Sequence, residues 1–277
     1  MTSAEIAYWN GPAGEKWVKR QVIWDRVLYP VAMALLDLAA PQPGERVVDV
    51  GCGCGATSFM LAERVGASGR VLGLDVSAPM LAHARRRQPA GLPLDFALAD
   101  ATDYGFAEPT DLMVSRFGVM FFSDPVRAFT NLRSGLRPGG RLVFSCFRKP
   151  SENPWTMVPL QAAYLHVPPL PKPGAEDPGP FSFADPERVR RILSRASFGN
   201  VRLTPLDLSF DLAAGEGLDA AVASVLEIGS TSRAIEGAPT SVVEAVASSV
   251  REALSAYQEG SNVLLPAAVW LVAAENL

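Results

Sequence analysis

The chain has 277 residues, of which 48% are hydrophobic and 19% are charged. This composition provides enough apolar material for a large core and excludes global disorder, and the length suits one α/β domain with an accessory cap. The net charge of −4 disfavours a nucleic-acid partner, because affinity for a phosphate backbone depends on clustered Lys and Arg side chains.

Three cysteines are present, and two of them, Cys52 and Cys54, lie in a glycine-rich stretch. An odd and low count does not describe a disulfide framework, so we expect a reducing, cytoplasmic location. Two thiols at this spacing also lack the four ligands that zinc prefers, and we expect no metal site. The first residues lack a secretory signal pattern, and no apolar run reaches the ~20 residues that span a bilayer. The sequence leaves monomer and homodimer open.

Residues 1–43 are predicted to form an N-terminal helical layer. It carries Trp9 and Trp17 among mixed charges, and Pro41 and Pro43 end it.

Residues 44–148 alternate short apolar runs with amphipathic stretches, which predicts βαβ units and a parallel sheet with right-handed crossovers. We expect strands at residues 46–50, 70–74, 94–98, 111–115 and 140–147. Helices are expected at residues 57–65, after the capping residue Ser77, and from Pro125 to about Arg137.

Residues 149–277 are predicted to hold a lid insertion, a helical cap and two last strands that complete the same sheet. Nine prolines between residues 148 and 184 indicate an irregular lid. Helices are expected near residues 155–166, 186–196, 220–228 and 241–257, and strands at residues 201–212 and 262–274. The predicted fold class is therefore α/β, a Rossmann-like seven-stranded sheet with helical cap and lid insertions.

A glycine-rich turn joins the first predicted strand to the first helix, with Gly51, Gly53 and Gly55 after Asp49. Glycine has no Cβ and tolerates positive φ, so a ligand can approach the backbone closely. The start of the next helix presents free N–H groups. Asp75, at the end of the second strand, can accept hydrogen bonds from both hydroxyls of an adenosine ribose. This combination predicts a nucleoside cofactor.

Gly51 and Gly53 also fit the loose dinucleotide fingerprint, so an NAD(P)-dependent oxidoreductase is one alternative. Against it, Asp49 would repel a pyrophosphate, and about 45 residues precede the turn. A second adenosine-side signal follows the third strand, where Asp100 can accept from the adenine amino group and the Ala101 N–H can donate to a ring nitrogen.

Five stretches in order resemble the class I S-adenosylmethionine-dependent methyltransferases, in the broad group that includes the ubiquinone/menaquinone-biosynthesis C-methyltransferases. They are Val47–Gly55, Val71–Ser77, Leu98–Ala101, Asp111–Phe122 and Leu136–Val143. The resemblance covers roughly residues 44–148. It implies S-adenosyl-L-methionine as cofactor, S-adenosyl-L-homocysteine as product, and an antiparallel last strand beside the fifth, so that the sheet is mostly parallel.

The resemblance also implies which residues contact the cofactor. Its methionine part is expected at Asp49, Gly51, Gly53 and Gly55, its ribose at Asp75 with Val76 beside it, and its adenine at Asp100 and Ala101.

The segment Ser115-Arg116-Phe117 follows the fourth strand, and in the resembling enzymes it lies near the transferred methyl group. Ser115 and Phe117 are therefore counted in the cofactor site. Trp9 and Trp17 are also assigned to this site, because their aromatic faces can attract the positively charged sulfonium. The alternative is that they only pack against the sheet.

No catalytic dyad is visible in the sequence. Two residues are catalytic candidates. Arg116 could face a substrate anion, with a structural ion pair as the ordinary interpretation. His166 could act as a general base in the lid, with a structural or exposed histidine as the ordinary interpretation.

Methyl transfer from a sulfonium is an in-line displacement that needs a base only when the nucleophile arrives protonated. We therefore expect an S-adenosylmethionine-dependent methyltransferase acting on a small organic acceptor that is aromatic, polyketide-like or lipid-like. A non-catalytic S-adenosylmethionine-binding protein is the other alternative. The sequence does not separate O-, N-, C- and S-methylation.

Overall fold

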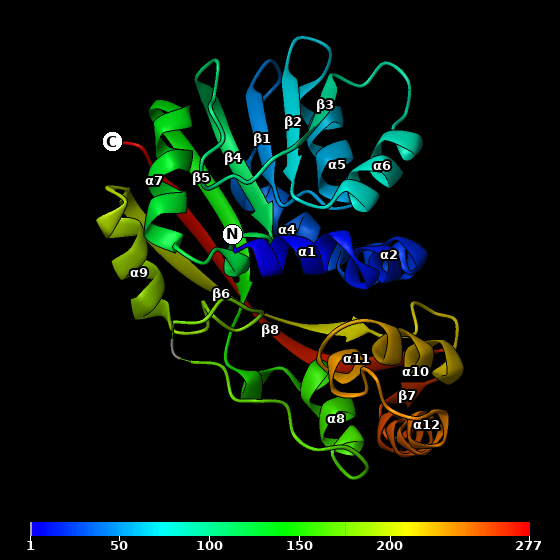
Figure 1. Ribbon diagram of the computed structural model, residues 1–277. Coiled ribbons are helices and arrows are strands. Elements are labelled where there is room, and N and C mark those ends of the chain that lie inside the picture. The colour runs from blue at the N-terminus through cyan, green and yellow to red at the C-terminus, as the bar shows by residue number, and fades with distance from the viewer. Residues whose placement is uncertain (1, 175) are drawn as a thin grey trace.

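The computed structural model describes residues 2–174 and 176–277, and Figure 1 shows its α/β architecture. The main sheet has the strand order β3-β2-β1-β4-β5-β8-β6. The strands are β1 (Arg46–Val50), β2 (Arg70–Asp75), β3 (Leu94–Leu98), β4 (Thr110–Arg116), β5 (Leu136–Phe147), β6 (Gly199–Asp211), β7 (Gln258–Glu259) and β8 (Asn262–Glu275). The predicted Rossmann-like fold class is confirmed.

The sheet is mostly parallel. Strands β1 to β5 pair in parallel, whereas β8 runs antiparallel between β5 and β6. The antiparallel last strand beside the fifth is therefore confirmed. Strand β7 adds a short hairpin to β8 that the sequence did not predict, because two residues are too few to show an alternating pattern.

The helices begin where the sequence places caps. The side chains of Ser77, Asp124 and Asp185 accept backbone N–H groups at the starts of α6, α7 and α9, and a proline follows within each first turn. The helices are α1 (Ser3–Asn10), α2 (Pro12–Lys19), α3 (Gln21–Val27), α4 (Tyr29–Ala39), α5 (Ala56–Val65), α6 (Ala78–Arg87), α7 (Pro125–Gly135), α8 (Pro154–Ala163), α9 (Pro186–Arg195), α10 (Leu218–Glu227), α11 (Ser230–Ala234) and α12 (Thr240–Ser255), with 3-10 turns η1 (Val119–Phe121) and η2 (Pro150–Glu152).

One boundary differs from the prediction. Helix α7 ends at Gly135 rather than near Arg137, and β5 begins at Leu136 rather than Gly140. Leu136 already pairs with Thr110, and the register then shifts. The extra residues bulge out of the ladder at this point, which a turn-like Pro-Gly-Gly sequence does not reveal.

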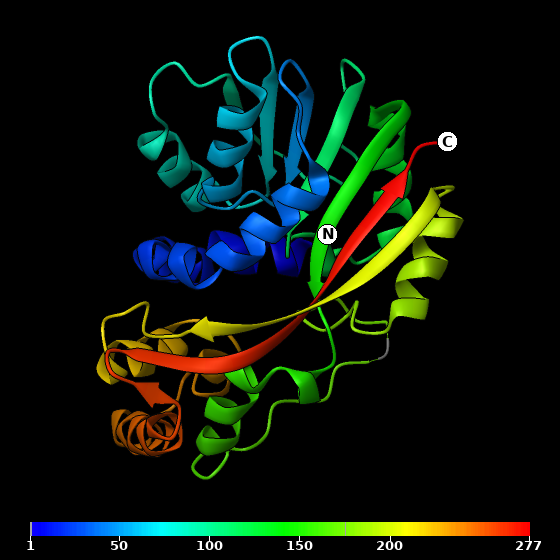
Figure 2. The same cartoon turned by 180° about the vertical axis from the view of Figure 1, so that it is seen from behind.

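Helices cover both faces of the sheet. Figures 1 and 2 show α7 and α9 on one face and α4 and α5 on the other. Strands β6 and β8 continue past the sheet as a twisted ribbon to the cap, which consists of α8, α10, α11 and α12 (Figure 2). Helices α1 to α3 lie between the carboxyl ends of β1, β2 and β4 and this cap (Figure 1). Within the described ranges, no helix has the length and apolar character to cross a membrane.

The proline-rich segment is tied to the edge of the sheet. Met120 O, in η1, accepts hydrogen bonds from the Gly179 N–H (3.0 Å) and from the Ser182 hydroxyl (2.7 Å). Trp270 Nε1, in β8, donates to Ala184 O at 3.1 Å. The segment that the sequence predicts as a lid is therefore anchored at its carboxyl-terminal end.

The turns after β1 and β4 touch through their backbones. A Cβ built on Gly118 would lie 2.6 Å from Val50 O and 2.9 Å from Gly51 Cα. Ser115 Oγ donates to Val50 O at 2.7 Å and accepts from the Gly118 N–H at 3.1 Å. This contact brings the ends of two neighbouring strands together and leaves no room for a side chain.

We therefore expect Gly118→Ala to destabilise the protein by about 2 kcal/mol or more, because the obstructing atoms belong to backbone and cannot rotate away. Gly118 has φ −80°, so the loss would come from the clash and not from backbone strain. Gly105→Ala is the matched control, since nothing lies within 4 Å of its Cβ position. Urea unfolding of both variants checks this, and equal midpoints would contradict it.

Candidate functional site

The glycine-rich turn opens α5 at the carboxyl edge of the sheet. Gly51 has φ +70° and Gly55 has φ +85°, conformations that favour glycine. Gly55 is the N-cap residue of α5, and no side chain caps this helix. Gly51 N donates to Leu74 O at 2.8 Å, which fixes the turn to the end of β2. The first N–H groups of α5 thus remain available to a ligand.

Asp75 lies against this turn. Its carboxylate accepts the N–H of Gly53 at 2.7 Å and the N–H of Ser77 at 2.8 Å. Burial raises the pKa of Asp75, and the backbone hydrogen bonds oppose that shift. The carboxylate therefore points to the glycine turn, where the sequence places the ribose site.

Asp49 is buried beneath the same turn. Its Oδ2 accepts a hydrogen bond of 2.6 Å from the hydroxyl of Ser58 in α5. Burial raises the pKa of Asp49 to about 6, although the Ser58 hydrogen bond and the charge of Arg116 act in the opposite direction. A buried carboxylate with one hydroxyl donor and no direct ion pair favours a cationic ligand group.

The adenine-side residues follow β3. Asp100 accepts the N–H of Thr102 at 2.9 Å. Asn131, in α7, donates to Ala101 O (3.0 Å) and to Tyr104 O (2.9 Å), so one amide holds the whole loop. The sequence analysis missed Asn131, because its partners lie 30 and 27 residues away and no local pattern links them.

Helix α1 is docked on the loop after β2. Asn10 Nδ2 donates to Val76 O at 2.7 Å, and Asn10 Oδ1 accepts the Ala78 N–H at 2.9 Å. Ser77 Oγ donates to Trp9 O at 2.7 Å. The N-terminal layer therefore borders the predicted ribose site, and Asn10 is a second positioning residue that the sequence analysis missed.

Aromatic rings form a continuous series from α1 to the cap, here called the aromatic wall. Trp17 lies 6.4 Å from Trp9 and is stacked on Trp24 at 5.7 Å, and Trp24 lies 6.1 Å from Trp155 of the cap. Its members are Trp9, Trp17, Trp24, Phe117, Phe121, Phe147, Trp155, Phe181 and Phe210.

Phe117 is held in the wall by an unusual backbone. It has φ +63° and is stacked on Phe147 at 4.1 Å with an interplanar angle of 10°. A left-handed conformation in a bulky residue is strained and is found where the surrounding structure demands it. The side chain of Ser115, by contrast, is fully buried and bonded to backbone.

The two catalytic candidates lie in different places. Arg116 ends β4 beside Phe117, and the charges of Asp25 and Asp49 act on it. His166 follows α8 at the exposed surface of the cap, where its Nε2 lies 2.8 Å from Ser249 Oγ. The structure thus places Arg116, but not His166, near the predicted cofactor residues.

Charged side chains join the N-terminal layer to the cap. Glu227, in α10, accepts Arg20 Nε at 2.7 Å and Lys19 Nζ at 3.0 Å. Hydrogen bonding from Arg20 lowers the pKa of Glu227 to about 2, with Lys19 contributing further. Arg26 Nη1 pairs with Glu216 at 3.1 Å. Ion pairs therefore add to the ring contact between Trp24 and Trp155 across this boundary.

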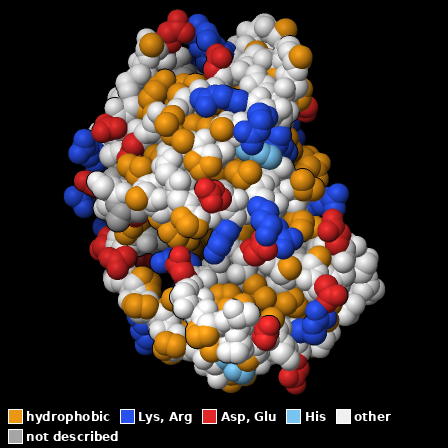
Figure 3. Space-filling model, turned by 45° about the vertical axis from the view of Figure 1, so that its right-hand side comes forward, with side chains coloured by type: hydrophobic (Ala, Val, Ile, Leu, Met, Phe, Trp, Pro, Cys, Tyr) orange, Lys and Arg blue, Asp and Glu red, His pale blue; other side chains and the backbone are white. Residues whose placement is uncertain are grey.

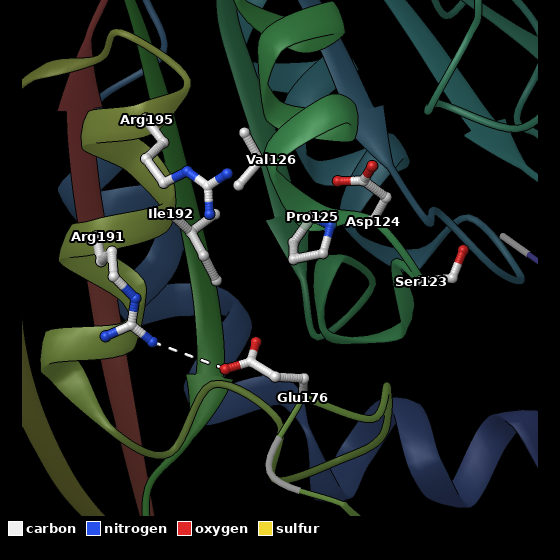
Figure 4. Close-up of a pocket in the computed structure, with 8 residues that line it drawn as sticks. All are labelled: Ser123, Asp124, Pro125, Val126, Glu176, Arg191, Ile192 and Arg195. Atoms are coloured by element: carbon white, nitrogen blue, oxygen red, sulfur yellow. Dashed lines mark ion pairs between the residues drawn. The ribbon is translucent and has the colours of Figure 1, made fainter.

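A separate cavity of about 360 Å³ lies between the start of α7 and α9, and none of the predicted site residues lines it (Figure 4). Its ion pair joins Arg191 to Glu176 at 3.8 Å. On the face in Figure 3, basic and acidic side chains are interspersed. No group of three His, Cys, Asp or Glu residues within 2–174 and 176–277 is arranged to hold a metal ion.

Known proteins are similar to this chain in sequence and in fold. A family model described as a methyltransferase domain matches residues 47–140. Nocamycin O-methyltransferase of Saccharothrix syringae is 34% identical over 200 residues, which cover 68% of this chain and 71% of that protein. Demethylmenaquinone methyltransferase of Beutenbergia cavernae is 34% identical over 163 residues, which cover 57% of this chain and 63% of that protein.

The fold resembles that of a solved structure, phosphoethanolamine N-methyltransferase 2 of Haemonchus contortus in complex with S-adenosyl-L-methionine. The TM-score is 0.54 at 18% identity, and the match covers 92% of this chain and 56% of that chain.

The raised pKa of Asp49 yields a stability prediction. In the unfolded chain the Asp49 carboxyl ionises near pH 4, whereas in the folded protein burial keeps it protonated up to about pH 6, so the folded state loses stability as the pH rises between these two values. Asp49→Asn removes this penalty and is expected to stabilise the ligand-free protein by about 3 kcal/mol at pH 7.5 but hardly at pH 4. Denaturant titrations at both pH values measure it. The exposed Asp103→Asn is the control, and a gain independent of pH would contradict the assignment.

The ionic boundary yields a second prediction. Glu227→Gln should loosen the N-terminal layer, because Lys19 and Arg20 lose their shared carboxylate. Hydrogen exchange in residues 12–27 should become faster in the variant, and 0.5 M salt should accelerate the wild type more than the variant. Glu244→Gln, at an exposed position of α12, should change neither quantity. Identical exchange in Glu227→Gln and wild type would show that the ion pairs do not hold the layer.

Proposed function

Because the chain belongs to the class I S-adenosylmethionine-dependent methyltransferases, we propose that it methylates an oxygen atom of a small, flat, aromatic or polyketide-like molecule. Membership of this family makes the chain an enzyme, gives it S-adenosylmethionine as methyl donor and sets aside the oxidoreductase alternative. The same membership disfavours a non-catalytic binding protein. The acceptor and the atom that is methylated are the parts proposed here.

The aromatic wall is the observation that carries this proposal. Its rings lie along the carboxyl ends of the strands, where ligands bind in open α/β sheets. Trp24 is buried, and its indole N–H has no acceptor among the described residues. A buried donor without a partner is unfavourable, so an acceptor molecule with an oxygen atom would complete it while its flat apolar part packs on the rings.

Relatives support oxygen as the methylated atom. The protein that covers 68% of this chain is named for O-methylation of nocamycin. The relative named for demethylmenaquinone leaves carbon as the second candidate. A flat apolar wall with one free N–H donor suits both acceptors, and the relative that covers more of this chain favours oxygen.

The cofactor site follows from the residues around the glycine turn. We assign the methionine part to Asp49, Gly51, Gly53 and Gly55, the ribose to Asp75 and Val76, and the adenine to Asp100 and Ala101. The fit rests on two buried carboxylates at the turn. Asp49 accepts the Ser58 hydroxyl and Asp75 accepts two backbone N–H groups, and no ion pair neutralises either carboxylate among the described residues.

Trp9 and Trp17 close this site from the N-terminal layer, and their ring faces suit a sulfonium. Ser115 and Phe117 form the side of this site next to the sheet. Ser115 joins the turns after β1 and β4 by hydrogen bonds, and the ring of Phe117 lies against Phe147.

Catalysis in this arrangement is positioning. S-adenosylmethionine supplies an activated methyl group and a neutral leaving group. The chain aligns the acceptor oxygen against the aromatic wall and excludes water with the N-terminal layer and the cap. No general base is assigned, because His166 lies at the surface of the cap against Ser249. An acceptor whose hydroxyl ionises near neutral pH needs none.

A labelled-methyl assay tests the proposal. Purified protein with S-adenosylmethionine carrying a CD3 group is offered hydroxylated aromatic polyketides, a hydroquinone with a free ring carbon and phosphoethanolamine. We expect a CD3 ether on a polyketide hydroxyl. A CD3 group found on a ring carbon would show that carbon, and not oxygen, is the methylated atom. Transfer only to phosphoethanolamine would overturn the proposal of an aromatic acceptor.

Asp75→Asn is the companion variant, with Asp95→Asn, at an exposed position of β3, as matched control. Calorimetry should show an affinity for S-adenosylhomocysteine at least about 10-fold weaker in Asp75→Asn, since a charged acceptor of ribose hydroxyls is lost. Unchanged affinity would remove Asp75 from the site.

A further inference from the structure

Arg116 stands out among the charged groups near the glycine turn. Within residues 2–174 and 176–277 its guanidinium makes no hydrogen bond and no ion pair. Burial lowers the pKa of Arg116, while the charges of Asp25 and Asp49 oppose that shift. A partly buried guanidinium without a direct partner calls for an anion, because desolvated charges are stable only when paired.

The register of the sheet places Arg116 on the side of Asp49. Val114 pairs with Asp49 in the parallel ladder between β4 and β1, and residues two apart on a strand share a face. Arg116 therefore projects from the same face as Asp49, at the last residue of β4. Asp49 is itself bonded to Ser58 of α5, so this carboxylate lies beside the amino end of that helix.

Neighbouring charges are already neutralised. Asp25, in α3, accepts Arg87 Nη2 at 2.9 Å, and Arg87 Nη1 donates to Cys54 O in the glycine turn at 3.0 Å. Asp25 and Arg87 thus form a closed pair that ties the N-terminal layer to the turn. Asp49 and Arg116 remain as one negative and one positive group that do not touch each other.

We propose that Arg116 binds the carboxylate of the cofactor's methionine part, on the same sheet face as Asp49, to which the methionine part is already assigned. The inference rests on the proposed cofactor site, and it assigns to Arg116 a binding role rather than a role toward the acceptor. An α-amino acid carries both charges on one carbon atom, so a separated carboxylate and guanidinium on one sheet face match it.

Three adenosine ligands isolate the carboxylate. S-adenosylhomocysteine has the complete amino acid, its decarboxylated analogue keeps the amine alone, and 5′-methylthioadenosine has neither group. Calorimetry is done with wild type, Arg116→Met and Arg116→Lys, and with Arg64→Met, in α5 and paired with Asp37, as control. These measurements need no acceptor and no turnover.

We expect Arg116→Met to bind S-adenosylhomocysteine about 10- to 100-fold more weakly than wild type, and Arg116→Lys to recover part of the loss. The affinity for the decarboxylated analogue and for methylthioadenosine should not change. Equal losses for all three ligands would mean that Arg116 only supports the fold. Unchanged S-adenosylhomocysteine affinity, with weaker binding of an ionised phenol, would assign Arg116 to the acceptor instead.

The outcome is separable from that of the proposed function. Absence of transfer to any hydroxyl, together with the expected ligand pattern, would leave the role of Arg116 intact and overturn only the acceptor. Failure of the wild type to bind S-adenosylhomocysteine would overturn both.

Discussion

The backbone contact between the turns after β1 and β4 is the constraint on which the site depends. Gly51 and Gly118 meet without side chains, and Ser115 bonds to both strands at that point. The turn after β1 thereby holds its N–H groups at the edge of the sheet, and the turn after β4 is forced to place Phe117 at positive φ. One close approach thus sets the geometry of both the proposed cofactor site and the proposed acceptor site.

The N-terminal layer completes the site by two kinds of contact. Toward the sheet, the side chains of Asn10 and Ser77 make hydrogen bonds that join α1 to the backbone of the loop after β2, and these bonds hold the layer firmly in place. Toward the cap, Glu227 and its two cations form contacts that water and salt can replace. The ion pairs are the part of this boundary that ionic strength can loosen, whereas the ring contact between Trp24 and Trp155 is apolar.

The sequence predicted those features that depend on local residue patterns, such as strands, helix caps and turns. Residues 94–98 form a strand as expected, Ser77 caps α6, and Asp75 faces the glycine turn. It did not predict Asn10 or Asn131, because an amide that holds a distant loop has no periodicity and no fixed spacing. Helix α11, with five residues, is likewise too short to show a helical pattern. Arg87 pairs with Asp25 of α3 and with Cys54 O of the glycine turn. These contacts depend on how the layers pack, which the sequence alone does not determine.

Charge explains why the site keeps carboxylates that do not favour folding. Asp49 is buried, the Ser58 hydroxyl is its only direct hydrogen-bond donor in the described part of the chain, and burial raises its pKa. A site evolved for stability alone would carry an amide there, since an uncharged group avoids the desolvation penalty. The family's methyl donor carries positive charge on sulfur and on nitrogen, so in the proposed site the same carboxylate that weakens the empty fold would strengthen binding. Affinity for a cationic donor and destabilisation of the ligand-free chain then have one physical cause, the ionised carboxylate under the glycine turn.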